Sequence, residues 1–123
     1  MILADSSVWI AHLRSPVAEL ASTIQTGELL LHPFVIGELA CGNLGGRREM
    51  LHFLAKMPSA PVATHSEALG FLESHSLMGK GIGFVDLHLL ASTSLAETAL
   101  LWTRDKRLGK AASELGLAYE AKR

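Results

Sequence analysis

Four carboxylates stand in sequence contexts that are unusual for surface acids. Asp5 follows the apolar run "MILA", Glu38 lies in "VIGELA", and Asp86 lies in "GFVDLHLLA". Asp105, in "LLWTRDKRL", comes just after an apolar run and stands among basic residues. A buried ionised carboxylate is strongly disfavoured without compensation, and neighbouring carboxylates raise one another's pKa values. If the fold brings these acids together, they predict a positively charged partner.

The chemistry of the four acids favours a hard cation as that partner. Oxygen ligands with no associated Cys or His suit Mg²⁺ or Mn²⁺, which take a few carboxylates and keep several waters. The six histidines are scattered without a recognised zinc spacing. One or two such ions would relieve the repulsion among the acids, orient a phosphodiester and activate a water molecule.

Each acid also has a purely structural interpretation. Asp5 stands where it can cap the helix that follows it. Glu38 fits the polar side of an otherwise apolar helix, and Asp86 fits the first turn of a helix, where the helix dipole favours an acid. Asp105 fits an ordinary solvated run of charges. No single acid is diagnostic, and the prediction rests on the ordered set.

The positions of these acids depend on an alternation of strands and helices. Apolar runs predict strands over residues 1–5, 28–32, 60–64, 98–103 and 117–121. Helical spacing, caps and glycine stops predict helices over residues 6–13, 16–25, 33–46, 47–57, 66–79, 84–97 and 104–116. This alternation indicates an α/β fold with a mostly parallel sheet covered on both faces, in a single domain over residues 1–123. Ligands of such sheets gather at the carboxyl ends of strands, which is where Asp5 stands.

Composition narrows the class of protein further. Hydrophobic residues make up 49% of the 123 residues and charged residues 19%, which indicates a core-rich fold rather than disorder. The formal net charge of -1 gives no overall basic field. One cysteine excludes an intramolecular disulfide and fits a reducing compartment. No apolar run approaches the roughly 20 residues that span a bilayer, so we expect a cytoplasmic protein without a membrane partner.

Four short motifs together resemble a known family. They are "LADSSVWI", "VIGELACG", "GIGFVDLHLLAS" and "LWTRDKRL", and their order and spacing cover essentially the whole chain. In these motifs the chain resembles PIN domains, in particular the VapC-type toxin ribonucleases of toxin-antitoxin modules. The resemblance implies a three-layer α/β/α sandwich and a metal-dependent endoribonuclease that uses Mg²⁺ or Mn²⁺. It also implies an RNA substrate and a VapB-type antitoxin, and we expect a homodimer.

The resemblance also assigns roles to residues. Asp5, Glu38, Asp86 and Asp105 match the family's four acidic positions, which implies that they are catalytic and bind metal. Ser6 and Thr103 match hydroxyl positions that would hydrogen-bond these carboxylates or a metal-bound water, although either could simply cap a helix. RNA phosphates could be held by Arg104, Lys106, Arg107 and Lys110, which could equally form a solvated helix face.

Two other functions remain open at this level. One is a phosphoryl-accepting α/β domain with Asp5 as the acceptor, although Ser7 stands where a phosphatase of that kind would carry a second Asp. The other is a non-catalytic RNA-binding or assembly module that keeps the fold. The four ordered acids favour the metal-dependent ribonuclease over both.

Overall fold

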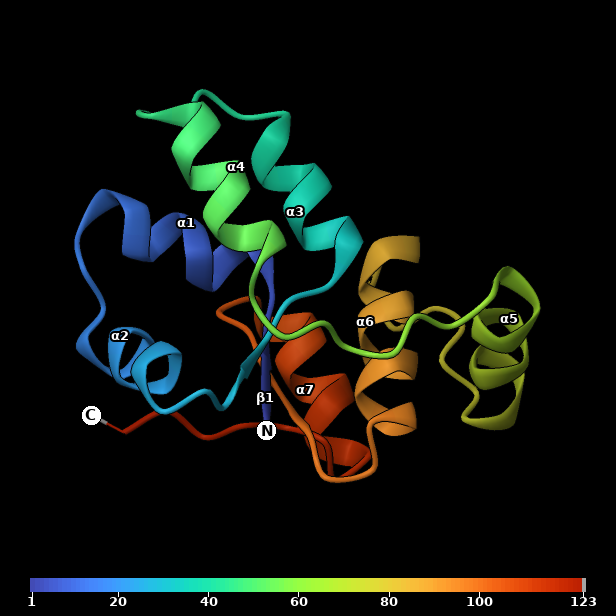
Figure 1. Cartoon of the computed structure of the whole chain (residues 1–123). Coiled ribbons are helices and arrows are strands. Elements are labelled where there is room, and N and C mark those ends of the chain that lie inside the picture. Colours follow the sequence, from blue (N-terminus) through green and yellow to red (C-terminus); the bar gives the residue numbers. More distant parts are fainter. Residues whose placement is uncertain (123) are drawn as a thin grey trace.

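A three-stranded parallel sheet forms the centre of the molecule (Figure 1). The fold is given by a computed structural model, which describes residues 1–122. The strands are β1 (Ile2–Ala4), β2 (Leu29–Leu30) and β3 (Leu100–Trp102), in the order β2-β1-β3. Both pairings with β1 are parallel. Because parallel strands are covered on both faces, their residues can be apolar throughout, as they are here.

Helices surround this sheet. They are α1 (Ser6–Arg14), α2 (Ala18–Gln25), α3 (Pro33–Ala40), α4 (Arg47–Ala55), α5 (His65–Ser74), α6 (Phe84–Leu95) and α7 (Lys106–Glu114). Figure 1 shows α3 and α4 as a hairpin beyond α1, with α5 beside α6 at the opposite end of the molecule. The α/β class with a parallel sheet is therefore confirmed. The single domain over residues 1–123 stays a prediction, and Arg123 lies outside the described residues.

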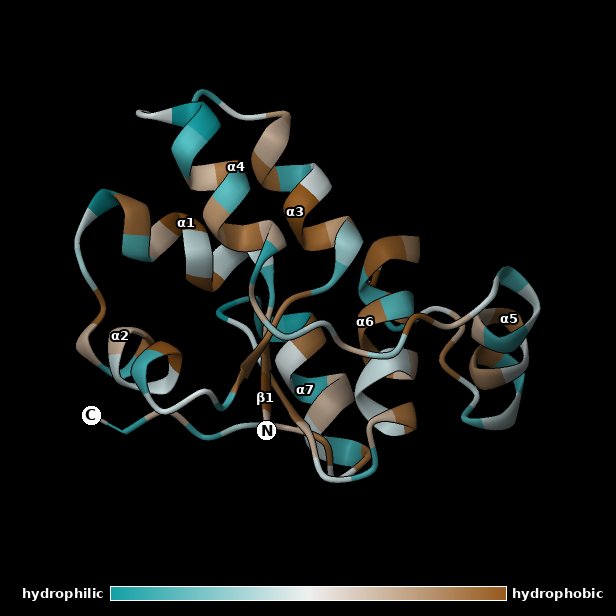
Figure 2. Ribbon diagram, in the orientation of Figure 1, coloured by the Kyte–Doolittle hydropathy of each residue, from teal (hydrophilic) through white to brown (hydrophobic). Residues whose placement is uncertain are grey.

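The core gathers around the sheet. Figure 2 shows that the central strands are hydrophobic along their length. Leu3, Leu29 and Leu101, one from each strand, are almost fully buried, as are Trp9 of α1 and Leu90 of α6. Within residues 1–122, no helix combines the length and the apolar character needed to cross a membrane.

Two of the predicted strands are wrong as strands. The prediction for 60–64 reduces to one parallel bridge between Leu31 and Ser59, and the prediction for 117–121 reduces to one between Leu101 and Ala118. Pro61 explains why residues 60–64 form no strand, because proline has no backbone N–H to donate to a neighbouring strand. The bridges still place these segments along the two outer edges of the sheet.

One predicted helix also ends early. The segment 33–46 is helical only to Ala40, and Gly46 caps α4 from a left-handed conformation with φ of 60°. Three glycines between Ala40 and Arg47 favour this break, because glycine weakens a helix interior and tolerates positive φ. The break allows α3 and α4 to fold back on each other.

Candidate active site

Asp5 lies at the carboxyl end of β1, and three donors fix its side chain. The backbone N–H of Val8 donates to Oδ1 at 3.2 Å, which makes Asp5 the cap of α1. The hydroxyl of Ser7 donates to the same oxygen at 2.5 Å, and the hydroxyl of Thr103 donates to Oδ2. Only 5% of Asp5 is exposed. The capping role predicted as an alternative is therefore real, and it coexists with contacts that reach far along the chain.

Thr103 connects two of the predicted acids. Its hydroxyl donates to Asp5 and accepts the backbone N–H of Asp105 at 3.0 Å. The backbone N–H of Arg104 in turn donates to the Ser7 hydroxyl at 2.9 Å. These bonds join the segment after β3 to the segment after β1. The hydrogen bond from Thr103 to Asp5 is thus present, and its role in supporting metal ligands stays a prediction.

The serine that contacts Asp5 is Ser7, whereas the sequence analysis named Ser6. Ser6 is the first residue of α1 and is half-buried, and in residues 1–122 the only serine hydroxyl on Asp5 is that of Ser7. The sequence offers a signal for this, because a side chain two residues after an N-cap Asp can fold back to its carboxylate. A role for Ser6 itself stays a prediction.

Asp105 and Asp86 stand at the starts of two helices. Asp105 caps α7 through the N–H of Leu108, 2.9 Å from its Oδ1. Asp86 lies in the first turn of α6, where its Oδ2 accepts the N–H of Gly83 at 3.1 Å. Each of these carboxylates thus keeps one oxygen that accepts no hydrogen bond from residues 1–122.

The electrostatics of Asp86 show which acids lie near one another. Burial raises the pKa of its carboxyl, the hydrogen bond from Gly83 opposes that shift, and the charges of Asp105 and Asp5 raise the pKa further. Like charges act in this way only when they are close. The structure therefore brings Asp5, Asp86 and Asp105 together at the carboxyl end of the sheet, and we call them the acid triad.

The acid triad suits a hard cation in its donor chemistry. A carboxylate offers about four lone-pair positions, and the three hydrogen bonds at Asp5 leave one of them on Oδ2. Mg²⁺ needs only one or two carboxylates because it keeps several waters. Among residues 1–122, no three His, Cys, Asp or Glu side chains form a group that could hold a metal ion. An ion at these acids would therefore need water for most of its ligands.

Glu38, the fourth predicted acid, has different neighbours. It is exposed on α3 and lines a cavity of about 450 Å³ together with Arg14 and Leu13 of α1. It does not figure among the charges that shift the pKa of Asp86. Its roles in catalysis and metal binding therefore stay predictions.

Three of the predicted RNA-binding cations are divided between two cavities. Arg104 lines a cavity of about 540 Å³ with Ser7 and Arg14. Arg107 and Lys110 line a different cavity with Lys80. The fourth, Lys106, is exposed at the first position of α7. Arg14 joins these cations, and its spacing is the signal for it, because Arg14 follows Ser7 by seven residues and so shares its helix face.

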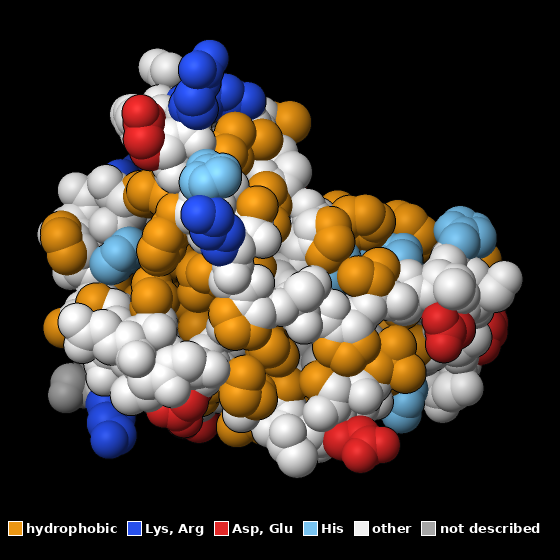
Figure 3. Space-filling view, viewed as in Figure 1, with side chains coloured by type: hydrophobic (Ala, Val, Ile, Leu, Met, Phe, Trp, Pro, Cys, Tyr) orange, Lys and Arg blue, Asp and Glu red, His pale blue; other side chains and the backbone are white. Residues whose placement is uncertain are grey.

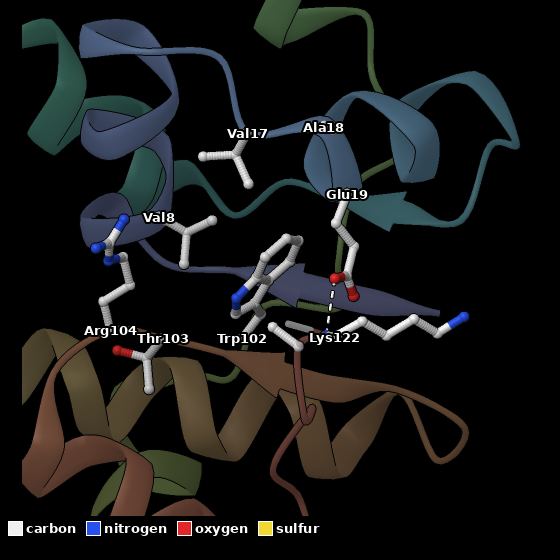
Figure 4. Close-up of a pocket in the computed structure, with 9 residues that line it drawn as sticks. Val8, Val17, Ala18, Glu19, Trp102, Thr103, Arg104 and Lys122 are labelled. Carbon is white, nitrogen blue, oxygen red and sulfur yellow. Dashed lines mark hydrogen bonds between the residues drawn. The ribbon is translucent and has the colours of Figure 1, made fainter.

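A fourth cavity, of about 520 Å³, is lined in part by Thr103. Figure 4 shows Trp102 in it, between Arg104 on one side and Glu19 on the other. Glu19 accepts the backbone N–H of Lys122 at 2.8 Å and the hydroxyl of Tyr119. The hydrogen bond to Glu19, with burial, raises the pKa of Tyr119 to about 12. The C-terminal segment that follows α7 is thereby held against α2 and closes one side of this cavity.

Two buried histidines lie close to the site without joining it. Burial, and then the neighbouring His88, lowers the pKa of His32 to about 4. Burial also lowers the pKa of His88. Both rings are therefore neutral near pH 7 and pack in T-shaped contacts against Phe34. No zinc-binding role follows from them.

Comparison with known proteins places the chain in a family. Two relatives, both named Ribonuclease VapC32, come from Mycobacterium tuberculosis strains CDC 1551 / Oshkosh and ATCC 25618 / H37Rv. Each is 47% identical over 118 residues, which is 96% of this chain and 95% of the relative. No family model matches the chain. Identity at this level over nearly the whole length, together with the α/β fold, shows that the chain belongs to the VapC family of PIN-domain toxins.

Proposed function

We propose that this chain is a metal-dependent endoribonuclease toxin that hydrolyses RNA phosphodiester bonds at the acid triad. The carrying observation is that the charges of Asp105 and Asp5, from two other motifs, raise the pKa of Asp86. The relatives named as ribonucleases align with 96% of this chain and support an RNA substrate. Glu38 is proposed as a fourth acid that acts on the same ion through water.

Mg²⁺ or Mn²⁺, when bound, would lower the pKa of a water molecule and neutralise charge on the scissile phosphate. The protein's own contribution is to hold the carboxylates in place. Ser7, Thr103 and the N–H of Val8 fix Asp5, and the N–H of Gly83 fixes Asp86. Because these partners hold the carboxylates in one orientation, a cation can bind them without first reordering the side chains. By family analogy, the products carry a 5′-phosphate and a 3′-hydroxyl.

The proposed partners follow from the family and from the surface. A VapB-type antitoxin is expected to neutralise the chain in the cytoplasm. A homodimer is supported by exposed apolar side chains, among which Phe34 and Phe84 both pack against the ring of His88. Figure 3 shows hydrophobic side chains gathered across the middle of one face, with Lys and Arg clustered over α4.

The arrangement of Asp5 weighs against a phosphoryl-accepting domain. The residue is 5% exposed and its carboxylate already accepts three hydrogen bonds, so an incoming phosphoryl group would have to displace some of them. A non-catalytic RNA-binding module would need no such converging acids. Neither alternative has an observation in its favour.

The test is RNA cleavage by the purified chain, free of any antitoxin, with and without added Mg²⁺ or Mn²⁺. We expect cleavage that a chelator abolishes and that Asp86→Asn reduces by at least about 100-fold, because a ligand and its charge are lost. Glu73→Gln, which removes an exposed acid from α5, is the matched control and should leave cleavage unchanged. Full cleavage by Asp86→Asn, or cleavage in chelator, would contradict the proposal.

A further inference from the structure

The glycine-rich loop before α6 and the outer face of α7 enclose a small cavity of about 260 Å³. Its lining residues are Gly79, Lys80, Arg107, Lys110, Ala111 and Glu114. The four from α7 are related by steps of three or four residues, so they form a single stripe on that helix. Three of the six lining residues are cations and one is an acid, so the cavity is positively charged.

Arg107 is held in this cavity by the shape of the loop. A Cβ atom added to Gly81 would lie 2.6 Å from Cδ of Arg107 and 3.2 Å from its Nε and Nη1 atoms. The arginine side chain therefore packs directly on the backbone of the loop. Gly79 and Gly81 also have φ angles of 73° and 77°, which L side chains rarely adopt. These two conformations turn the loop so that Lys80 faces the same cavity.

The two segments that line the cavity are close in sequence to two acids of the triad. The loop that lines the cavity ends at Gly83, whose backbone N–H donates to Asp86. The helix that lines it, α7, begins directly after Asp105, and Arg107 follows Asp105 by two residues. A separate cavity, lined by Arg14 and Arg104, also contains Ser7, which bonds Asp5. Cations thus line two cavities whose walls lead to residues of the acid triad.

We propose that Lys80, Arg107 and Lys110 bind one backbone phosphate of the RNA beside the phosphate that is cut. The RNA strand then runs from the Arg14 and Arg104 cavity, across the acid triad, to the loop of Gly79 and Gly81. A planar guanidinium and two ammonium groups match the charge and the several oxygens of a phosphodiester. The proposal rests on the proposed function for the identity of the substrate.

The first test measures binding of a single-stranded RNA oligonucleotide in chelator, where no cleavage is needed. Lys80→Ala and Arg107→Ala should each weaken binding about 5-fold to 20-fold, and the double variant should lower the slope of log affinity against log salt by about 0.7. Lys56→Ala removes an exposed cation at the end of α4, away from this cavity, and serves as the matched control. Unchanged affinity and salt slope in the double variant would overturn the proposal.

The second test locates the phosphate on the RNA. In a series of oligonucleotides, each carrying one neutral methylphosphonate linkage at a different position, we expect one position at which neutralisation weakens binding by the wild type but not by Arg107→Ala. No such position would overturn the proposal. The proposal would also be overturned if Lys80→Ala and Arg107→Ala bound RNA normally and lost affinity only for an acidic protein partner.

The kinetic consequence separates this site from the acid triad. In cleavage assays, Arg107→Ala should raise KM and leave kcat within about 2-fold, because the phosphate it holds is not the one that reacts. If the chain binds RNA through this cavity but never cleaves it, the proposed function fails while this inference stands. If cleavage is normal and the binding tests are negative, this inference fails while the proposed function stands.

Discussion

Three donors hold the carboxylate of Asp5, and they come from two ends of the chain. Ser7 and Val8 follow Asp5 by two and three residues, whereas Thr103 lies 98 residues further along the chain. The first two contacts are those of an ordinary helix cap, and the third belongs to the site. At the scale of single residues, one carboxylate therefore serves both the folding of α1 and the proposed binding of a cation.

Thr103 is the residue whose removal tests this connection. In Thr103→Val the hydroxyl that donates to Asp5 and accepts from Asp105 is lost, while the shape is retained. We expect cleavage at limiting Mg²⁺ to fall about 10-fold to 100-fold, as is usual when a partner of a metal ligand is removed. Thr103→Ser should keep most of the activity. The measurement is the Mg²⁺ concentration at half-maximal cleavage, and identical titrations for the wild type and Thr103→Val would contradict the prediction.

We expect the ionised carboxylate of Asp86 to lower the stability of the folded chain while it supports cleavage. Burial and the charges of Asp105 and Asp5 raise its pKa in the folded chain above the ordinary 3.8, so the folded chain binds this proton more readily than the unfolded chain does. Its contribution to stability is therefore favourable below pH 3.8 and is lost as the pH rises through the raised pKa. In metal-free solution, Asp86→Asn should stabilise the chain near pH 7 and have less effect near pH 4.

Urea denaturation of the wild type and Asp86→Asn at the two pH values measures this effect. The expected sign is a higher free energy of unfolding for the variant near neutral pH, although its cleavage is lost. A variant that is less stable than the wild type near pH 7 would show that the carboxylate is not under electrostatic strain.

Helix starts carry the site at the scale of secondary structure. Asp5 caps α1, Asp105 caps α7, and Asp86 lies in the first turn of α6. The N–H groups at these helix ends have no partners within the helix, and they favour nearby negative charge. The same geometry that ends a strand and begins a helix thus places Asp5 and Asp105 at the carboxyl end of the sheet, and the start of α6 brings Asp86 to them.

Substitution of Asp105 by serine distinguishes the role of this residue as a helix cap from the role of its charge. Ser is about as good an N-cap as Asp, whereas Ala lacks a capping oxygen and costs about 1 kcal/mol. We therefore expect Asp105→Ser to keep the melting temperature near that of the wild type, and Asp105→Ala to lower it. Both should lose cleavage to a similar extent if the carboxylate acts on the metal. Activity in Asp105→Ser equal to that of the wild type would assign this residue to capping alone.

The loop before α6 is a second element with a sharp requirement. In Gly81→Ala the new methyl group must displace Arg107, and the φ of 77° costs a non-glycine residue about 1 to 2 kcal/mol. We expect a lower melting temperature and weaker RNA binding together. Gly70→Ala, on α5 with open space around its Cβ position, is the control and should not lower stability. Normal RNA affinity in Gly81→Ala would argue against the packing of Arg107 described above.

The sequence predicted these elements well where local chemistry decides them. The runs at β1 and β3 and the cap at Asp5 are visible in the residue types alone, whereas at Asp105 the residue types indicate a solvated run of charges and not the cap of α7. No strand forms over 60–64, because Leu31 is paired there only through a single bridge to Ser59. Apolar content alone does not predict which segments pair. The contact from Thr103 to Asp5 could be expected only through the family resemblance. The bond from Ser7 to Asp5 has a local signal in their spacing of two residues, whereas the cavity at Lys80 depends on tertiary geometry that no local pattern encodes.

The whole molecule leaves apolar groups exposed that a second copy could cover. Phe34 is 37% exposed and Phe84 is 46% exposed, and both pack on the buried ring of His88 between α3 and α6. An exposed apolar patch of this kind commonly marks an interface. If the proposed homodimer uses it, the chain should have twice its 13.2 kDa mass in solution.

Light scattering after size-exclusion chromatography measures that mass. We expect Phe34→Ser together with Phe84→Ser to shift the chain to the monomer mass. Phe53→Ser removes an equally exposed phenylalanine from α4 and should leave the dimer intact. A wild-type chain that is monomeric at every concentration, or a double variant that stays dimeric, would contradict this use of the patch.

The order of the strands has a consequence for synthesis. The central strand β1 leaves the ribosome first, but its neighbour β3 and the Thr103 hydroxyl follow almost a hundred residues later. Until then β1 has an unpaired edge, Asp5 lacks its distant donor, and neither Asp86 nor Asp105 has a frame to hold it. A nascent chain stalled before β3 would therefore lack an assembled acid triad, and cleavage would begin only after β3 and Thr103 have been made.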